Sequence, residues 1–132
     1  MKLPNLVDKL MGVYRKHYSI IIAVDFDDTI YNYSGQDFDV DYVIDLIKQC
    51  QLELGAKVIL FTCRENELLE AALKYCSEKD LYIDRANTSL ENYEYPSRKP
   101  FYNILLDDKA CLPEACAALE TVLDWKRNHY DY

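Results

Sequence analysis

Polar residues that could do chemistry fall in three short clusters, and each cluster follows an apolar stretch of the chain. They are residues 25–29 (DFDDT), 62–64 (TCR) and 107–109 (DDK). Three or four carboxylates brought together would repel one another and would stay ionised only beside compensating positive charge. A divalent cation supplies that charge, and Mg²⁺ suits a site of oxygen ligands that includes a few carboxylates. The clusters therefore predict a magnesium site, provided that the fold brings them to one place.

The apolar stretches before the clusters predict buried strands. Residues 19–25 and 57–62 are rich in β-branched side chains without polar alternation, as expected of strands covered on both faces. Residues 101–107 are predicted to form another strand, and residues 81–84 a short additional one. Because such sheets bind ligands outside the carboxyl ends of their strands, all three clusters should meet at that edge.

Helices are predicted between these strands. Apolar side chains recur near the 3.6-residue period in residues 3–17, 40–54 and 65–79. Gly55 follows the second of these segments, at a position where a helix end favours a left-handed residue. Residues 113–125 are predicted to form the last helix, with proline in its first turn.

The order of these elements predicts an α/β fold. It is typical of a doubly wound, Rossmann-like parallel sheet with helices on both faces. The chain has 132 residues, half of them hydrophobic, which is material for one core, so residues 1–132 are expected to form a single domain. Residues 1–18 would be a helix on its flank.

Bulk properties exclude several classes of protein. The net charge of −8 repels nucleic-acid backbones, so duplex nucleic acid is not an expected partner. No apolar run reaches the roughly 20 residues of a membrane span, and the N-terminus lacks the pattern of an export signal. Five cysteines, an odd number set mostly in apolar runs, suit reduced core residues of a cytoplasmic protein better than a disulfide framework. His17 and His129 lack partners at metal-ligand spacing, so zinc is not expected.

The clusters and their strands resemble motifs of the haloacid dehalogenase (HAD) superfamily. Residues 21–29 (IIAVDFDDT) resemble its first motif, an apolar strand followed by DxDx(T/V), and residues 60–62 (LFT) resemble the second. Residues 103–108 (NILLDD) are similar to the fourth motif, and Lys99 is a candidate for the lysine of the third. More narrowly, the chain resembles short bacterial and phage members of the superfamily that carry no cap domain.

The resemblance implies a Mg²⁺-dependent phosphohydrolase that acts on a phosphate monoester. Asp25 would be the nucleophile and form an aspartyl-phosphate, and Asp27 would protonate the leaving group and then activate water. Thr62 and Lys99 would hold the phosphoryl oxygens. Arg64 would be a further phosphate or substrate contact through its planar donor fork.

The same resemblance implies a set of metal ligands, namely Asp25, the backbone carbonyl of Asp27, and Asp107 or Asp108. Asp28 departs from the family pattern, because many members have glycine at that position. If the position needs a positive φ, an aspartate tolerates it better than most residues. Its charge would then add to the metal site.

The positive charge of the third motif has more than one candidate. Lys99 stands only eight residues before Asp107, closer than in many relatives. Arg98 or Lys109 could supply the charge instead.

Simpler interpretations stay open for individual residues. The Thr62 hydroxyl could cap the turn after its strand, and Arg64 could pair with Glu65 or Glu67 on the surface. Tyrosines in the loops are expected to pack those loops onto the body of the domain in preference to stacking on a nucleobase.

Short loops predict an open site. Residues 31–39 leave room only for a flap, and residues 84–99 only for a loop. Such a site would accept the phosphorylated end of a larger molecule, or a phosphorylated small molecule covered by a neighbouring subunit in an oligomer. Two other functions stay open: a catalytically silent HAD-like module for binding or regulation, and a receiver-type phospho-acceptor, which the order of the aspartates fits badly.

Overall fold

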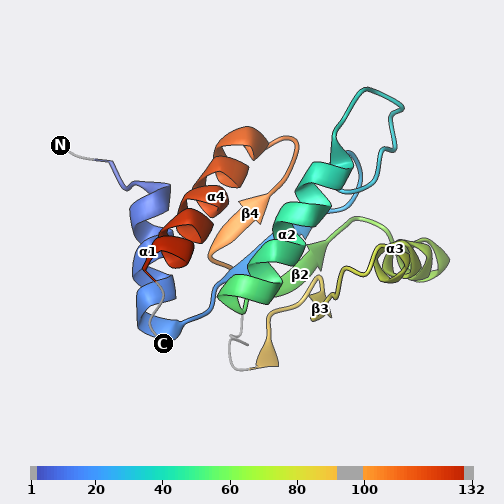
Figure 1. The fold of residues 1–132 in the computed structure, drawn as a ribbon. Helices are drawn as coiled ribbons and strands as arrows, with labels where there is room; N and C mark the ends of the chain where they lie inside the picture. The colour runs from blue at the N-terminus through green and yellow to red at the C-terminus, as the bar shows by residue number, and fades with distance from the viewer. Residues whose placement is uncertain (1–2, 92–99, 130–132) are drawn as a thin grey trace.

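The computed structural model describes residues 3–91 and 100–129, which form a parallel sheet of four strands flanked by four helices (Figure 1). In chain order the elements are α1 (Leu6–His17), β1 (Ile21–Asp25), α2 (Val40–Leu54), β2 (Lys57–Phe61), α3 (Asn66–Glu78), β3 (Arg85–Ala86), β4 (Ile104–Leu106) and α4 (Leu112–Asn128). This architecture confirms the predicted α/β, Rossmann-like fold, and the described residues contain no cap domain.

The strand order is β3-β2-β1-β4, with every neighbouring pair parallel. The chain moves outward from β1 to β2 and β3 and then returns to the other side of β1 for β4. The switch point of this topology, where doubly wound sheets bind their ligands, therefore lies between β1 and β4. Asp25 pairs with Phe61 at the end of β2, and Val24 pairs with Leu106 at the end of β4. The polar residues after all three strands consequently emerge at one edge.

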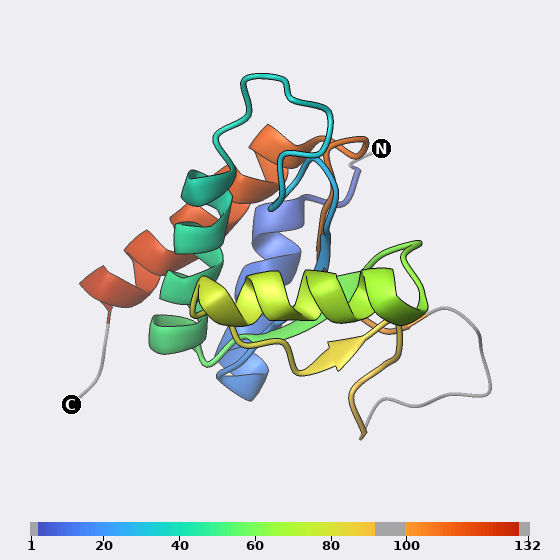
Figure 2. The same ribbon diagram turned by 90° about the vertical axis from the view of Figure 1, so that its right-hand side faces the viewer.

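Both faces of the central strands are buried. Ile22 and Leu60, which face the same side, have no exposed surface and join the main core with side chains of the helices. In that layer α4 contacts both α1 and α2, and α2 and α4 lie side by side (Figure 2). On the opposite side Ile59 is equally buried, and the connection from β3 to β4 packs there through Tyr102, whose ring meets Phe61 edge-on at 5.6 Å.

The helices begin and end close to their predicted bounds. α1 begins at Leu6 because the side chain of Asn5 accepts hydrogen bonds from the backbone N–H groups of Val7 (2.8 Å) and Asp8 (3.4 Å). α2 ends at Leu54 and is followed by Gly55, whose φ of 60° is the predicted left-handed conformation. Across residues 3–91 and 100–129, no helix combines the length and the apolar character that a membrane span requires.

The short strand predicted at residues 81–84 is misplaced, since β3 consists of Arg85 and Ala86. Just before β3, Asp84 makes the hydrogen bonds to β2 that a strand residue would make. Its backbone N–H donates to the carbonyl of Val58 (2.9 Å), and its carboxylate Oδ2 accepts from the backbone N–H of Val58 (2.7 Å). The side chain thus stands in for a backbone carbonyl, and a regular strand is not needed at this point.

Asn103 repeats this arrangement before β4. Its backbone N–H donates to the carbonyl of Ile21 (2.8 Å), and its side-chain Oδ1 accepts from the N–H of Ile21 (2.7 Å). The strand predicted from residue 101 therefore begins at Ile104.

We expect Asp84→Ala to lower the free energy of unfolding by about 1–3 kcal/mol, because the N–H of Val58 loses its acceptor. Urea denaturation measures this change. Asp84→Asn keeps an acceptor oxygen and should recover most of the loss. Asp45→Ala, at an exposed position of α2, should change stability by no more than about 0.5 kcal/mol. Equal losses at positions 84 and 45 would contradict the role given to Asp84.

Candidate active site

Three carboxylates meet at the carboxyl edge of the sheet, between β1 and β4. Asp25 ends β1, and Asp107 and Asp108 directly follow β4. Each offers a carboxylate oxygen, and these oxygens all lie within 4.8 Å of one another, with all three residues half-buried. We call this group the acidic cluster. The register of the sheet brings these residues together as the sequence predicts.

The acidic cluster changes the proton affinity of Asp25. Burial, followed by the negative charge of Asp107 and by the hydrogen bond and charge of Asp108, raises its pKa from the ordinary value of 3.8 to about 7. The backbone N–H of Phe26 acts in the opposite direction and is outweighed. Asp25 is therefore a carboxylate that needs a nearby positive charge to stay ionised at neutral pH.

The hydroxyl group of Thr29 contacts two members of the acidic cluster, Asp25 and Asp108. Its side chain is buried, with 1% exposure. Its hydroxyl oxygen lies 3.4 Å from Oδ2 of Asp25 and 3.5 Å from Oδ1 of Asp108, and it accepts a hydrogen bond from the backbone N–H of Asp108 (3.0 Å). Sequence reasoning gave Thr29 no role beyond its place in the DxDx(T/V) pattern. The DxDx(T/V) pattern was the sequence signal for this contact, because the chain turns after β1 and brings the fourth residue after Asp25 back to the Asp25 carboxylate.

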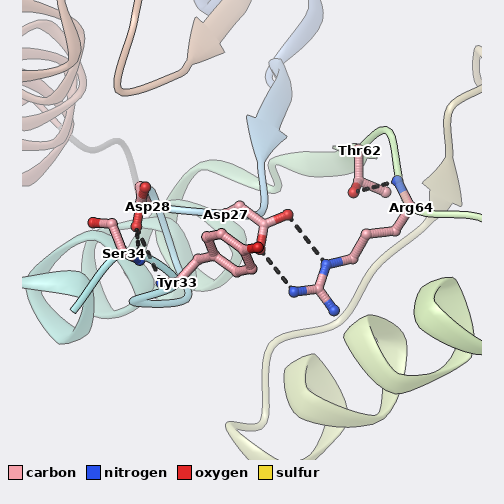
Figure 3. Close-up of polar contacts among 6 residues, drawn as sticks. All are labelled: Asp27, Asp28, Tyr33, Ser34, Thr62 and Arg64. Carbon is pink, nitrogen blue, oxygen red and sulfur yellow. Dashed lines mark hydrogen bonds and ion pairs between the residues drawn. The ribbon is translucent and has the colours of Figure 1, made fainter.

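Asp28 serves the loop that follows β1. Its φ of 62° is positive, a conformation that aspartate tolerates better than most residues. Its Oδ1 accepts hydrogen bonds from the backbone N–H groups of Tyr33 (3.0 Å) and Ser34 (2.9 Å) (Figure 3). The carboxylate thus shapes the flap of residues 31–39, and Asp28 is not one of the three residues of the acidic cluster. The addition of its charge to a metal site stays a prediction.

Asp27 and Arg64 form a two-point ion pair (Figure 3). Nε of Arg64 donates to Oδ2 of Asp27 (3.1 Å), and Nη2 donates to Oδ1 (2.7 Å). The guanidinium also lies over the ring of Phe26, 4.8 Å from its centroid, and 5.5 Å from the centroid of Tyr31. The partner of Arg64 is therefore Asp27, and the simpler pairing with the glutamates that follow it is not the one observed.

Thr62 is built into the turn after β2. Its hydroxyl oxygen accepts a hydrogen bond from the backbone N–H of Arg64 (3.1 Å), so the capping role is observed. Its own backbone N–H donates to Oδ1 of Asn87 (2.9 Å), and Asn87 has a positive φ of 58°. Asn87 was not singled out from the sequence, although asparagine is among the residues that tolerate this conformation. Phosphate binding by Thr62 stays a prediction.

Three residues were candidates for the positive charge of the third motif, and the structure describes one of them, Lys109. Lys99 and Arg98 lie outside the described residues. Lys109 is exposed, and its backbone N–H donates to Oδ1 of Asp107 (3.0 Å). This bond holds the carboxylate of Asp107 at the start of the turn, while the side chain of Lys109 faces solvent.

Aromatic packing fixes the start of the flap. Tyr31 stacks on Phe26 with ring centroids 5.2 Å apart, and Tyr75 meets both rings edge-on. The hydroxyl of Tyr75 donates to the carbonyl of Ile30 (2.8 Å). Tyr31 therefore packs its loop onto the body of the domain, as the simpler interpretation expected.

The five cysteines are free thiols. Burial raises the pKa of Cys50 to about 12 and those of Cys76 and Cys116 to about 11, which makes these three thiols unreactive. Cys63 and Cys111 are exposed, so the core role expected for the cysteines holds for three of them.

The fold and its acidic edge define a Rossmann-like α/β protein with a cluster of carboxylates at the topological switch point. No family model matches the chain, and no curated protein is detectably similar to it. Among solved structures, the chain is similar to a conserved protein from Bacteroides thetaiotaomicron, with a TM-score of 0.66 and 28% sequence identity. The alignment covers 86% of this chain and 99% of that chain. This similarity supports the fold.

The raised pKa of Asp25 predicts how stability depends on pH in the absence of metal. Since the pKa is about 7 in the folded protein and near 3.8 in the unfolded chain, stability is lost as the pH rises through that window. Asp25→Asn removes this loss. Relative to the wild type, we expect the variant to gain roughly 1–2 kcal/mol between pH 5 and pH 8, less than the full shift implies because solvent screens the charges.

Urea denaturation with a chelator present, at both pH values, measures this difference. Asp45→Asn, at an exposed site, is the matched control and should follow the wild type at both. A difference between Asp25→Asn and the wild type that did not change with pH would be inconsistent with a raised pKa.

Proposed function

We propose that the protein is a Mg²⁺-dependent phosphohydrolase that cleaves a phosphate monoester through an aspartyl-phosphate on Asp25. The observation that carries this proposal is the acidic cluster, in which three half-buried carboxylates crowd together at the switch point of the sheet. Within residues 3–91 and 100–129, no lysine or arginine forms an ion pair with any of them. Such an arrangement is typical of a site that receives its positive charge from a ligand.

The chemistry of the acidic cluster fits a magnesium ion. All of its donor atoms are oxygens, which Mg²⁺ prefers. Burial and then the neighbouring carboxylates raise the pKa of Asp25, and a bound cation would offset both effects. Asp25, Asp107 and Asp108 would hold the ion, with the backbone carbonyl of Asp27 as a further ligand. When bound, Mg²⁺ would neutralise charge on the phosphoryl oxygens of the substrate.

The residues around the acidic cluster divide the proposed reaction between them. A carboxylate oxygen of Asp25 forms a bond to phosphorus as the ester P–O bond breaks, and Asp27 gives its proton to the departing alcohol. Water then attacks the aspartyl-phosphate and loses its proton to Asp27, which releases inorganic phosphate and restores Asp25. Thr62 and Arg64, which follow β2 at the same edge, contact the phosphoryl oxygens.

The open edge indicates the kind of substrate. Because the described residues contain no cap domain, the site suits a phosphorylated small molecule or the phosphorylated end of a larger molecule. Free thiols in all five cysteines favour a cytoplasmic location for this activity.

Hydrolysis of a generic aryl phosphate with Mg²⁺ tests the proposal. Asp25→Asn keeps the shape of the side chain but removes the nucleophile, so kcat should fall on the order of a thousandfold or more. A chelator should abolish turnover of the wild type. Asp45→Asn should retain full activity. Equal turnover by Asp25→Asn and the wild type would refute an aspartyl-phosphate on Asp25.

Thr29→Val tests whether the buried hydroxyl organises the acidic cluster. The two side chains have the same shape, but valine removes the acceptor of the Asp108 N–H and the hydroxyl that contacts the carboxylate of Asp25. We expect Mg²⁺ affinity, measured by calorimetry, to fall about 10- to 100-fold. Thr29→Ser should bind Mg²⁺ nearly as well as the wild type. Unchanged affinity in Thr29→Val would show that the hydroxyl is dispensable.

A catalytically silent module for binding or regulation is the second candidate function. The ion pair of Asp27 and Arg64 favours it, because both oxygens of the acid needed for turnover accept hydrogen bonds from the arginine. Such a module would bind Mg²⁺ at the acidic cluster and leave every phosphate ester intact, so the turnover measurement separates the two functions.

A further inference from the structure

The pairing of Arg64 with Asp27 has a geometry that a phosphate could take over. Among the described residues, every hydrogen bond from the Arg64 side chain goes to Asp27, through Nε and Nη2. These parallel donors form the fork that binds two oxygens of a carboxylate, and the same fork binds two oxygens of a phosphate. The pair is also reachable, with side-chain exposures of 17% for Arg64 and 35% for Asp27.

The position of the pair brings it to the proposed site of the phosphate. Asp27 lies two residues beyond the proposed nucleophile Asp25, and Arg64 lies three residues beyond Phe61, the strand partner of Asp25. A phosphoryl group at Asp25 would therefore lie at the same edge of the sheet as the pair of Arg64 and Asp27. It would also need an oxygen of Asp27 for proton transfer, and both of those oxygens are engaged.

We propose that Arg64 exchanges Asp27 for the phosphoryl oxygens of the substrate, so that the ion pair is a self-inhibited resting state that a phosphoryl ligand opens. This inference rests on the proposed function in taking a phosphoryl group as the ligand. No covalent bond changes in the exchange, which replaces one pair of charge-assisted hydrogen bonds by another. The exchange frees Asp27 at the moment when the substrate is in place.

The surroundings of Arg64 let its side chain change partners without leaving the site. Its backbone N–H is anchored to the hydroxyl of Thr62 (3.1 Å), and its guanidinium rests over the rings of Phe26 and Tyr31. Phe26 is buried, with 1% exposure, and is therefore a fixed surface. The fork can turn over these rings from one anion to another while the cation remains in contact with them.

The exchange also narrows the class of substrate. A ligand must offer two coplanar oxygens and enough negative charge to compete with the carboxylate of Asp27. A phosphodiester also offers two free oxygens but carries a single negative charge. A terminal phosphate monoester carries close to two negative charges near neutral pH and therefore competes better with the carboxylate. Arg64 would thus select terminal phosphates as well as bind them.

Binding of inorganic phosphate in the presence of Mg²⁺, measured by calorimetry, tests the exchange without any need for turnover. Arg64→Ala should weaken binding by at least about tenfold, and Arg64→Lys should fall between it and the wild type because lysine lacks the fork. Asp27→Asn should strengthen binding about fivefold or more, since it removes the competitor for the fork. In the Arg64→Ala background the same Asp27→Asn change should alter affinity by less than about twofold.

A second ion pair of the same kind supplies matched controls. Nε and Nη2 of Arg127 donate to Glu53 at 2.7 and 2.6 Å, near the end of α2 that leads into β2 and so at the opposite edge of the sheet from Asp25. Arg127→Ala and Glu53→Gln should leave phosphate affinity unchanged. They show whether loss of a surface ion pair alone affects binding.

Three results would overturn the exchange. These are weaker or unchanged binding in Asp27→Asn, an effect of Asp27→Asn that is equally large without Arg64, and no phosphate binding by any variant. If any of these results is found while the protein still hydrolyses the aryl phosphate, the exchange is refuted and the proposed phosphohydrolase activity is retained. If the variants show the expected order of phosphate affinities but no turnover is found, the phosphohydrolase activity is refuted and the exchange is retained.

Discussion

The central position of β1 is the constraint on which the rest of the structure depends. The strand is paired in parallel with β2 on one side and β4 on the other, so its last residue, Asp25, is fixed relative to both neighbours. The chain that leaves β4 then places Asp107 and Asp108 against Asp25 despite the repulsion between their charges. Burial of the apolar strands supplies the free energy that holds these like charges together.

The regular elements could be predicted because their physical causes are local in the sequence. β1 and β2 are unbroken apolar runs, and the helices repeat their apolar side chains with the period of a helix turn. β3 could not be located in this way. Leu81 looks like the start of a strand but is a core residue of a loop, with 2% exposure, and Asp84 supplies with its side chain the pairing that a strand would give. Such side-chain mimicry has no periodic signature.

The candidate site was predictable in its outline for a similar reason. Strand ends fix where Asp25, Asp107 and Asp108 meet, whatever the rotamers of their side chains. The partners of Asp27 and Asp28 depend on those rotamers, and on an arginine that lies 37 residues from Asp27 in the sequence. Sequence spacing therefore identified the acidic residues but did not show that Asp27 is paired with Arg64 and that Asp28 holds the backbone of the flap.

The two outer strands of the sheet are short, with two residues in β3 and three in β4. An exposed strand edge carries unpaired backbone groups that can recruit a strand from another molecule and so begin aggregation. Here the edge at β3 is little more than one pairing step long, and the polar side chain of Asp84 ends it on one side. The edges that the described residues form are therefore short templates for another strand, and this brevity disfavours edge-to-edge association.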